Sequence, residues 1–329
     1  MVFTQKTVSE MQKSACLIDY PQGTQYQRNI GTGFFIKDCK NNNIFYFLIT
    51  NHNLNYILFD TEKPKLYGDN IELDCQFLSR KLDDFFISYP LYNENGELIR
   101  ILTLPSLFIE SIIIPNSRYK EDSKTEASET DFCIFKINFE KNKQIISHKN
   151  ILIDPNQIKL EIQKLCYQDF NLLNDKLNLK LNSNKEYIEK YIISRDGYAS
   201  LTGFPIEKTN IDYLDDKTVF MLEYSTMFAK IIKTDNTFIE FTAIKDKKGQ
   251  TPIKLSEDIN GLSGSPLLSR ILIQETPDPE TVKFDYIVLG MCIEGVTAIS
   301  IEYLQKIIKD KTKTTEITNP TFGQLIIEQ

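Results

Sequence analysis

The stretch GLSGSPLL, Gly261 to Leu268, places two glycines, two serines and a proline directly ahead of an apolar pair. A serine that attacks a carbonyl carbon needs its Oγ clear of the chain and backbone N–H groups that point at the developing oxyanion. Tight turns that contain glycine provide both, because glycine adopts positive φ. The same composition is typical of an ordinary loop between strands, so the stretch alone does not establish a nucleophile.

The bulk composition restricts the function classes. The chain has 329 residues with 41% apolar and 25% charged residues, which predicts one large globular domain or two coupled ones. A net charge of −7 without a block of Lys and Arg argues against nucleic-acid binding. No apolar run approaches the ~20 residues of a membrane span, and the start has no secretory signal, so we expect a cytoplasmic location.

Cysteine and histidine usage argues against a metal site. Six scattered cysteines form no C-x-x-C pair, and only two histidines are present. We therefore expect reduced thiols, with Cys133 and Cys292 packed in the core, and neither a metal nor a cofactor.

Most apolar runs are short, rich in β-branched or aromatic residues and bounded by turn residues, which predicts strands. They flank a helical segment, Asp154 to about Arg195, in which Asp154 and Pro155 supply an N-cap and a first turn. Further helices are expected at residues 184–193 and at about Ile301 to Lys309. The expected strands are GTGFFIKD (31–38), IFYFLIT (44–50), ESIIIP (110–115), DFCIFKI (131–137), TVFMLEY (218–224), TFIEFTAI (237–244) and DYIVLGMCIEG (285–295). The expected apolar face of the first helix consists of Ile158, Ile162, Leu165, Cys166, Phe170, Leu173 and Leu177.

Several short sequence motifs occur in an order that resembles that of a known family of enzymes. A Gly-Thr-Gly strand leads through a hairpin to a second strand that ends in Thr-Asn-His, so His52 stands at a strand exit. Asp131 begins an alternating strand, LTGFP follows at 201–205, and the Gly/Ser stretch comes after it. In these pieces and their order the chain resembles the trypsin-like (chymotrypsin-fold) serine peptidases, and most closely their intracellular branch. The order His, Asp, Ser differs from that of subtilisins and α/β-hydrolases.

The resemblance implies a mainly β fold: a chymotrypsin-like pair of six-stranded antiparallel barrels, with a helical insert between them and a C-terminal helix. It implies His52 as general base and acid, Asp131 as the residue that orients the imidazole, and Ser263, not Ser265, as nucleophile. The backbone N–H groups of Gly261 and Ser263 would form the oxyanion hole. No metal or cofactor takes part in such a mechanism.

The expected organisation follows from this assignment. Residues 1–27 form an N-terminal extension and 28–149 the first barrel, which carries the His and the Asp. Residues 150–195 form the helical insert, 196–300 the second barrel with the Ser, and 301–329 the C-terminal helix and tail.

The histidine register departs from the family. The family usually has one residue between Thr-Asn and the histidine, whereas here His52 follows Asn51 directly. Aligned without a gap, Asn53 falls on the base, and an amide cannot take up and return a proton at neutral pH. Aligned with a one-residue deletion, His52 is the base, and we favour this register because a histidine survives at the strand exit.

Other residues offer rival interpretations. Asp84 precedes an apolar run and competes with Asp131, but Asp131 has the cleaner alternation after it. Glu257 and Asp258 lie where the family's primary pocket begins, and a negative pocket floor there would prefer Lys or Arg. The alternative, which we favour, is that both carboxylates face solvent. His148 has no nucleophile-like context and is interpreted as a surface residue.

Three functions follow, in order of preference. The first is an intracellular trypsin-like serine endopeptidase acting on a protein or peptide, with an activating or regulatory protein partner left open. The second is an inactive pseudopeptidase that binds a peptide or protein in the same cleft. The third is an interaction protein that acts through its helical insert.

Overall fold

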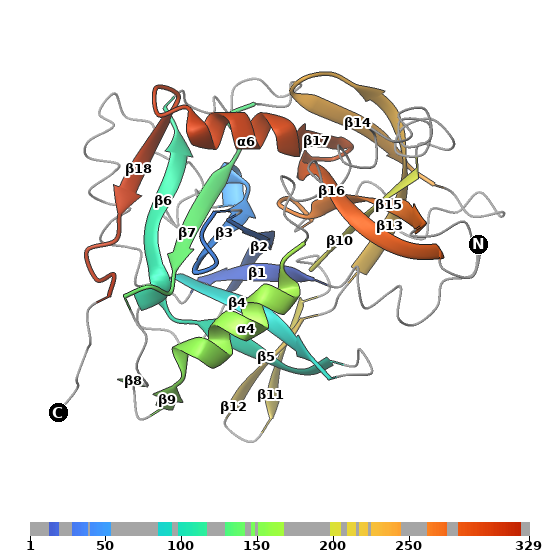
Figure 1. Cartoon of the computed structure of the whole chain (residues 1–329). Coiled ribbons are helices and arrows are strands. Elements are labelled where there is room, and N and C mark those ends of the chain that lie inside the picture. Colours follow the sequence, from blue (N-terminus) through green and yellow to red (C-terminus); the bar gives the residue numbers. More distant parts are fainter. Residues whose placement is uncertain are drawn as a thin grey trace.

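The structure is a computed structural model. Most of the described strands lie in two β units, and the two longer helices of the described residues lie outside these units (Figure 1). It describes residues 13–19, 28–38, 40–53, 85–93, 98–116, 129–141, 146–148, 151–167, 198–204, 209–214, 217–222, 225–244, 262–274 and 282–323.

The first unit is an antiparallel sheet of eight strands, in the order β18-β6-β7-β3-β2-β1-β4-β5. Its strands are β1 (Ser14–Asp19), β2 (Arg28–Lys37), β3 (Ile44–Ile49), β4 (Phe85–Tyr92), β5 (Leu98–Leu104), β6 (Ile109–Pro115), β7 (Cys133–Asn138) and β18 (Thr314–Thr318). A one-turn 3-10 helix, η2 (Ser106–Phe108), precedes β6. The ribbon β8 (Ile146–His148) and β9 (Ile151–Ile153) leads to helix α4 (Pro155–Leu165).

The second unit is a closed barrel of six strands, in the order β10-β13-β14-β17-β16-β15. They are β10 (Tyr198–Gly203), β13 (Ser225–Thr234), β14 (Phe238–Ala243), β15 (Pro266–Gln274), β16 (Val282–Glu294) and β17 (Thr297–Ser300). Helix α6 (Ile301–Lys309) follows β17 directly. The predicted mainly β architecture with two β units is confirmed. The second unit is the expected six-stranded barrel, whereas the first is a sheet of eight strands where a six-stranded barrel was expected.

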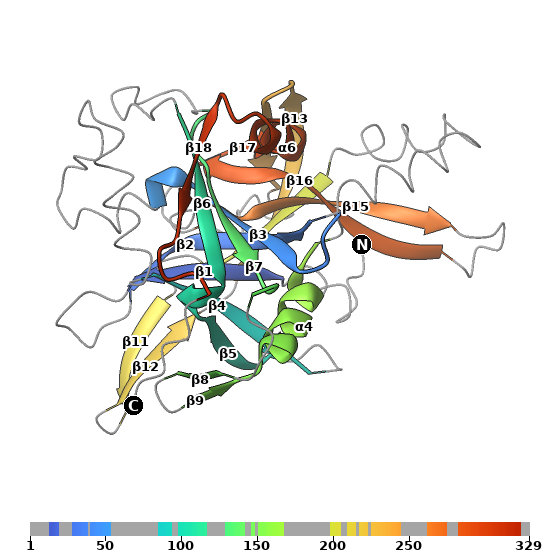
Figure 2. The ribbon, with the colours of Figure 1, turned by 60° about the vertical axis from the view of Figure 1, so that its left-hand side comes forward.

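The expected strands all form, but the strand expected at TVFMLEY does not join the barrel, although it lies between barrel strands in the sequence. It becomes β12 (Lys217–Leu222), which pairs with β11 (Thr209–Leu214) in a separate ribbon of two described strands. Figure 2 shows this ribbon pointing away from the barrel, on the opposite side from the long β15–β16 hairpin.

Strands β2, β3 and β7 are buried on both faces, which explains their nearly continuous apolar sequences. On one face Phe35, Phe47 and Phe135 pack in the core of the first unit, with ring centroids 5.1 Å apart for Phe35–Phe47 and 6.0 Å apart for Phe47–Phe135. On the other face, Phe34 and Leu48 belong to a second cluster. Successive side chains along each strand therefore point alternately into the core of the first unit and into the second cluster.

That second cluster joins the two units. It combines Phe34 and Leu48 of the first unit with Leu268 and Met291 of the barrel. Helix α6 covers it with its apolar face, which consists of Ile301, Leu304 and Ile307. The units are thus held together by a shared apolar core, and α6 crosses from one to the other (Figure 1).

Two strands of the first unit come from segments that we expected to lie outside it. β1 falls within residues 1–27, yet it pairs with both β2 and β4. β18 falls within residues 301–329, yet it pairs antiparallel with β6. Both strands are short and have a weak apolar pattern, so their pairing with other strands defines them.

Helix α4 begins as the sequence predicts. The side chain of Asp154 accepts a hydrogen bond from the N–H group of Asn156 at 2.9 Å, and Pro155 occupies the first turn. The helix ends at Leu165, earlier than its apolar pattern, because Tyr167 leaves it to form a parallel bridge with Ile36 of β2. Phe170, Leu173, Leu177 and the helix expected at 184–193 lie outside the described residues.

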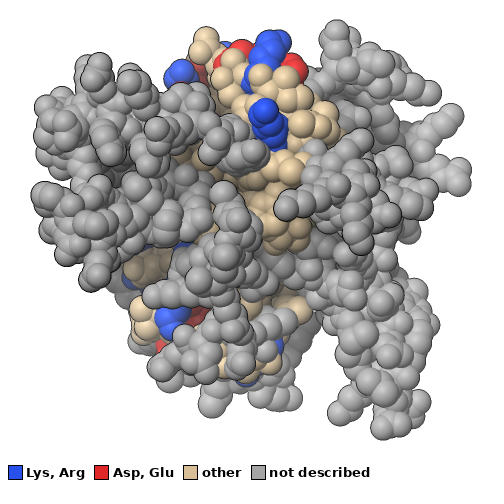
Figure 3. Space-filling view, turned by 90° about the vertical axis from the view of Figure 1, so that its right-hand side faces the viewer, with Lys and Arg blue, Asp and Glu red and all other residues tan. Residues whose placement is uncertain are grey.

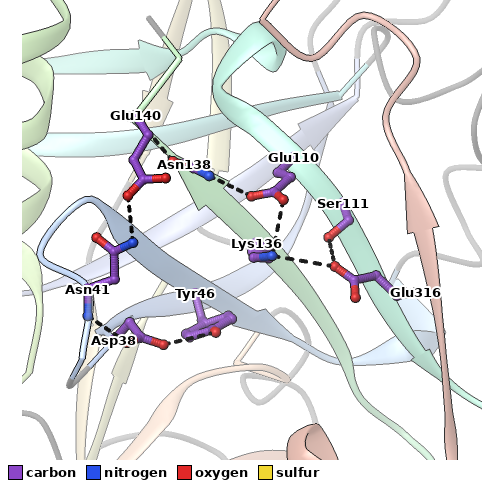
Figure 4. A network of polar contacts seen from close by, with 9 residues as sticks. All are labelled: Asp38, Asn41, Tyr46, Glu110, Ser111, Lys136, Asn138, Glu140 and Glu316. Atoms are coloured by element: carbon purple, nitrogen blue, oxygen red, sulfur yellow. Dashed lines mark hydrogen bonds and ion pairs between the residues drawn. The ribbon is translucent and has the colours of Figure 1, made fainter. Parts of the chain in front are cut away.

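A polar network fastens β18 to the sheet (Figure 4). Lys136 of β7 contacts Glu110 of β6 at 3.1 Å and Glu316 of β18 at 3.7 Å, while Ser111 donates to Glu316. The pairs are partly exposed, so each stabilises the fold by less than about 1 kcal/mol. They link side chains of three neighbouring strands, β7, β6 and β18.

The described surface offers little charge contrast on the face drawn in Figure 3. Most of it is neither basic nor acidic, and the charged side chains visible there have both signs. No helix of the described residues is long and apolar enough to cross a membrane.

Candidate functional site

His52 and Asp131 meet through two hydrogen bonds, although 79 residues separate them in the sequence. His52 lies in a short helical stretch that begins at Asn51, just after β3 ends. Its ring Nδ1 lies 2.7 Å from Oδ2 of Asp131, and its backbone N–H group donates to Oδ1 at 2.9 Å. Both carboxylate oxygens of Asp131 are therefore used by one residue.

This pairing fixes the tautomer of the imidazole. An ionised carboxylate only accepts hydrogen bonds, so Nδ1 of His52 must carry the proton that it shares with Asp131. In the neutral ring Nε2 is then unprotonated and can accept a proton. The side chain of Asp131 is only 4% exposed, whereas that of His52 is 24% exposed, so the ring remains accessible to a substrate.

Two hydrogen bonds hold the segment that carries Asp131 in place. The N–H group of Phe132 donates to the carbonyl of Thr130 at 2.9 Å, which closes a three-residue turn centred on Asp131. One residue earlier, Glu129 accepts a hydrogen bond from the hydroxyl of Tyr303, on α6, at 2.8 Å. The carboxylate is thus positioned by its own turn and by the C-terminal helix.

The Gly/Ser stretch forms a tight turn from Leu262 to Ser265. The N–H group of Ser265 donates to the carbonyl of Leu262 at 2.8 Å, and Gly264 has a φ of 89°. Ser263 is partly exposed, while Ser265 is 0% exposed and its Oγ has no hydrogen-bond partner among the described residues. Of the two serines, only Ser263 is accessible to a substrate.

Asn53, the rival for the base position, lies against the same turn. Its Nδ2 donates to the main-chain carbonyl of Ser263 at 3.1 Å. Its side chain lies so close to Gly31 of β2 that a β-carbon on Gly31 would overlap its amide. The structure thus pairs His52 with Asp131 and Asn53 with the backbone of Ser263.

Thr32 links the two units next to this turn. Its Oγ1 accepts a hydrogen bond from the N–H group of Phe204, just after β10, at 2.9 Å. A neighbouring bond joins Ser14 Oγ of β1 to the carbonyl of Thr202 at 2.9 Å. The Gly-Thr-Gly and LTGFP motifs are therefore in direct contact, and they hold β10 against the first unit.

Cys292 of β16 completes the surroundings of the turn. Its carbonyl accepts from the N–H group of Gly264 at 2.7 Å, and its own N–H group donates to Ser265 at 2.8 Å. Burial of the thiol, with a contribution from the negative charge of Asp131, raises the pKa of Cys292 to about 12. Cys133 and Cys292 are both fully buried, as expected from their apolar runs.

The remaining candidates lie beyond what the structure describes. Gly261, the second expected oxyanion donor, is outside the described residues, as are Asp84, Glu257 and Asp258. Of His148 the structure describes only the backbone, in β8. Within the described part of the chain, no group of three or more His, Cys, Asp or Glu side chains could hold a metal ion.

Comparison with known proteins gives structural similarities only. No protein-family model and no curated protein matches the sequence. The structure is similar to the serine endoprotease from Yersinia pestis, with 13% identity and a TM-score of 0.36 over 94% of this chain and 67% of that one. It is also similar to the Drosophila Grass clip serine protease of the Toll pathway, with 11% identity and a TM-score of 0.40 over 92% and 69%.

These two neighbours are serine proteases. A third is the tobacco vein mottling virus protease, with 11% identity and a TM-score of 0.27 over 96% of this chain and 88% of that one. Because every TM-score is 0.40 or lower, the assignment of the site depends on its own contacts.

Sequence patterns did not reveal three residues of this site. Cys292 acts through backbone atoms, which every residue has, so its residue type does not mark it. Thr32 acts through its backbone carbonyl and through its Oγ1, and the partners of both atoms are distant in the sequence. Asn53 was noticed only as a rival for the base, and its amide donor is the one signal that could have suggested a hydrogen bond.

Proposed function

We propose that this chain is a serine endopeptidase that acts on a protein or peptide. Ser263 is the nucleophile, His52 the general base and Asp131 the residue that orients the imidazole. The observation that carries the proposal is the double hydrogen bond between His52 and Asp131, made directly beside the residue that binds the backbone of Ser263. The exposure of Ser263, with Ser265 fully buried, supports the choice of serine.

The reaction follows from these roles. Oγ of Ser263 attacks the scissile carbonyl carbon while its proton passes to Nε2 of His52, and the N–H groups of Ser263 and Gly261 stabilise the tetrahedral oxyanion. The intermediate collapses when the C–N bond breaks and the amine takes the proton from His52. Water, deprotonated by His52, then hydrolyses the acyl-enzyme, which releases the acid and restores Ser263.

A pseudopeptidase is the second candidate, and one contact favours it. Asn53 binds Ser263, and it occupies the base position when the sequence is aligned with the family without a gap. This contact goes to the main-chain carbonyl and leaves Oγ of Ser263 unused by the amide. The two candidates therefore differ in whether His52 activates that hydroxyl.

Labelling with a fluorophosphonate probe, which reacts with activated serines, tests the proposal. The wild-type chain should be labelled, and Ser263→Ala and His52→Ala should each abolish labelling. Ser265→Ala is the matched serine control, because its Oγ is buried and bonds to no group in the described part of the chain. His148→Ala is the matched histidine control. Both controls should keep the wild-type rate, and cleavage of casein should follow the same order.

The opposite results are equally clear. A folded wild-type chain that takes no label and cuts no protein would contradict the peptidase and favour peptide binding without cleavage. Labelling that persists in His52→Ala would remove His52 from the base role. The expected cytoplasmic location and the regulatory partner are separate predictions.

A further inference from the structure

The peptide unit between Ser263 and Gly264 is the middle unit of a four-residue turn. The turn is closed by the hydrogen bond from Ser265 to Leu262, and the positive φ of Gly264 at its third position is that of a type II turn. In turns of this length the middle peptide can face either way, because types I and II differ mainly by its rotation. The rotation changes ψ of Ser263 and φ of Gly264, so Ser263 is one of the two residues whose backbone changes.

This peptide unit is held at both ends, once by each β unit. Its carbonyl oxygen accepts from Nδ2 of Asn53 at 3.1 Å, on the side of the first unit. Its N–H group donates to the carbonyl of Cys292 in β16 at 2.7 Å, on the side of the barrel. A rotated peptide would lose both hydrogen bonds, and the N–H group of the buried Gly264 would lose its partner.

The side chain of Asn53 is itself fixed. It is part of a residue that is only 4% exposed, and it fills the space in which a side chain at Gly31 would lie. It follows His52 directly, so the same helical stretch carries the proposed base and the donor to Ser263. A shift of this stretch would move both together.

We propose that Asn53 is a positioning residue for Ser263. Its amide holds the Ser263–Gly264 peptide in one of two orientations and thereby fixes the backbone from which Oγ of Ser263 projects. The catalytic consequence rests on the proposed peptidase function, whereas the effect on the peptide unit rests on geometry alone. The two parts therefore need separate measurements.

Asn53→Leu is the variant that separates them, because leucine has nearly the shape of asparagine but no donor. It leaves the carbonyl of Ser263 without this partner and adds no charge beside His52. Asn319→Leu is the matched control. Asn319 is only 2% exposed, and its amide donates to two backbone carbonyls, Ser106 at 3.1 Å and Ile109 at 2.9 Å, in another part of the first unit.

The first measurement is amide hydrogen exchange by NMR on the full chain. The rate at Gly264 is divided by the rate at the core amides of Phe47 and Phe135, so that a general loss of stability cancels. In Asn53→Leu this ratio should rise at least about tenfold, because the bond from Gly264 to Cys292 opens when the peptide rotates. In Asn319→Leu the ratio should stay within twofold of the wild type. If Asn53→Leu does not fold, Asn53→Ser, which is too short to reach the carbonyl, takes its place.

The second measurement is the rate of fluorophosphonate labelling of the same proteins. Asn53→Leu should be labelled roughly 10- to 100-fold more slowly than the wild type, because a small misplacement of a reacting group costs about this much. An unchanged exchange ratio in Asn53→Leu overturns the inference, whether or not the wild type is labelled. A raised ratio with an unchanged labelling rate also overturns it, because Ser263 is then not positioned by Asn53. A raised ratio in a chain whose wild type takes no label leaves the positioning supported and contradicts only the peptidase.

Discussion

The carbonyl oxygen of Thr32 lies against the α-carbon of Gly264, in the space where the β-carbon of any other residue would stand. Thr32 belongs to β2 of the first unit, and Gly264 belongs to the turn that carries Ser263. The approach of these two backbones sets how closely the two units meet at the candidate site. It also explains why a glycine is needed at this position.

Gly264→Ala should therefore destabilise the protein and slow labelling of Ser263. A positive φ costs a non-glycine residue about 1–2 kcal/mol, and the displacement of Thr32 should bring the total to about 3 kcal/mol or more. Gly295→Ala is the matched control, because Gly295 also has a positive φ, 49°, but has nothing within 4 Å of its β-carbon position. Urea denaturation measures both free energies of unfolding, and equal losses would show that the contact with Thr32 has no cost.

Asp131→Asn should slow fluorophosphonate labelling by about three orders of magnitude without unfolding the protein. The backbone N–H group of His52 requires an acceptor, so the new amide should turn its oxygen there and its NH₂ group towards Nδ1. That arrangement moves the ring proton to Nε2, which then cannot accept a proton from Ser263. Circular dichroism checks the fold, and a wild-type labelling rate would argue against any role for Asp131.

The thiol of Cys292 should be inert in the folded protein. Its pKa is raised to about 12 by burial and by the charge of Asp131, so its thiolate is scarcer near pH 8 than that of an ordinary cysteine. Iodoacetamide treatment at pH 8, followed by mass spectrometry, should leave Cys292 and the buried Cys133 unmodified until denaturant is added. Modification of Cys292 under native conditions would show that the barrel opens beside the turn.

Ile317→Ala should reduce stability by roughly 3 kcal/mol, because Ile317 of β18 is buried in the core of the first unit. Ile232→Ala is the control, since Ile232 is 65% exposed and its truncation should cost less than about 0.5 kcal/mol. Both values come from chemical denaturation of the full chain. Equal effects would mean that β18 contributes no core packing.

The sequence was most informative where one segment carries its own signal. Asp154 and Pro155 predicted the start of α4, and the apolar runs around Phe35 and Phe135 predicted β2 and β7. β1 and β18 escaped prediction because a short strand with a weak apolar pattern is defined by its partner, and the partner of β18 is about 200 residues away.

In the candidate site, too, some residues carry a local sequence signal and others are defined only by contacts with distant segments. His52, Asp131 and Ser263 were named through the resemblance to trypsin-like serine peptidases, which rests on short motifs and on their order in the chain. The sequence could not say whether His52 or Asn53 faces the carboxylate, since adjacent residues differ only by the direction in which the backbone turns them. The contacts of Asn53 and Thr32 join distant segments, and no local pattern encodes them.

The return of β18 to β6 has a consequence for synthesis on the ribosome. The sheet that carries His52 and Asp131 includes a strand from residues 314–318, so its last edge cannot form until these residues have left the exit tunnel. Until then β6 presents open backbone groups to the cell, at a stage when the barrel that carries Ser263 already has all its strands. The barrel, which lies later in the sequence, therefore has all its described strands before the first unit does.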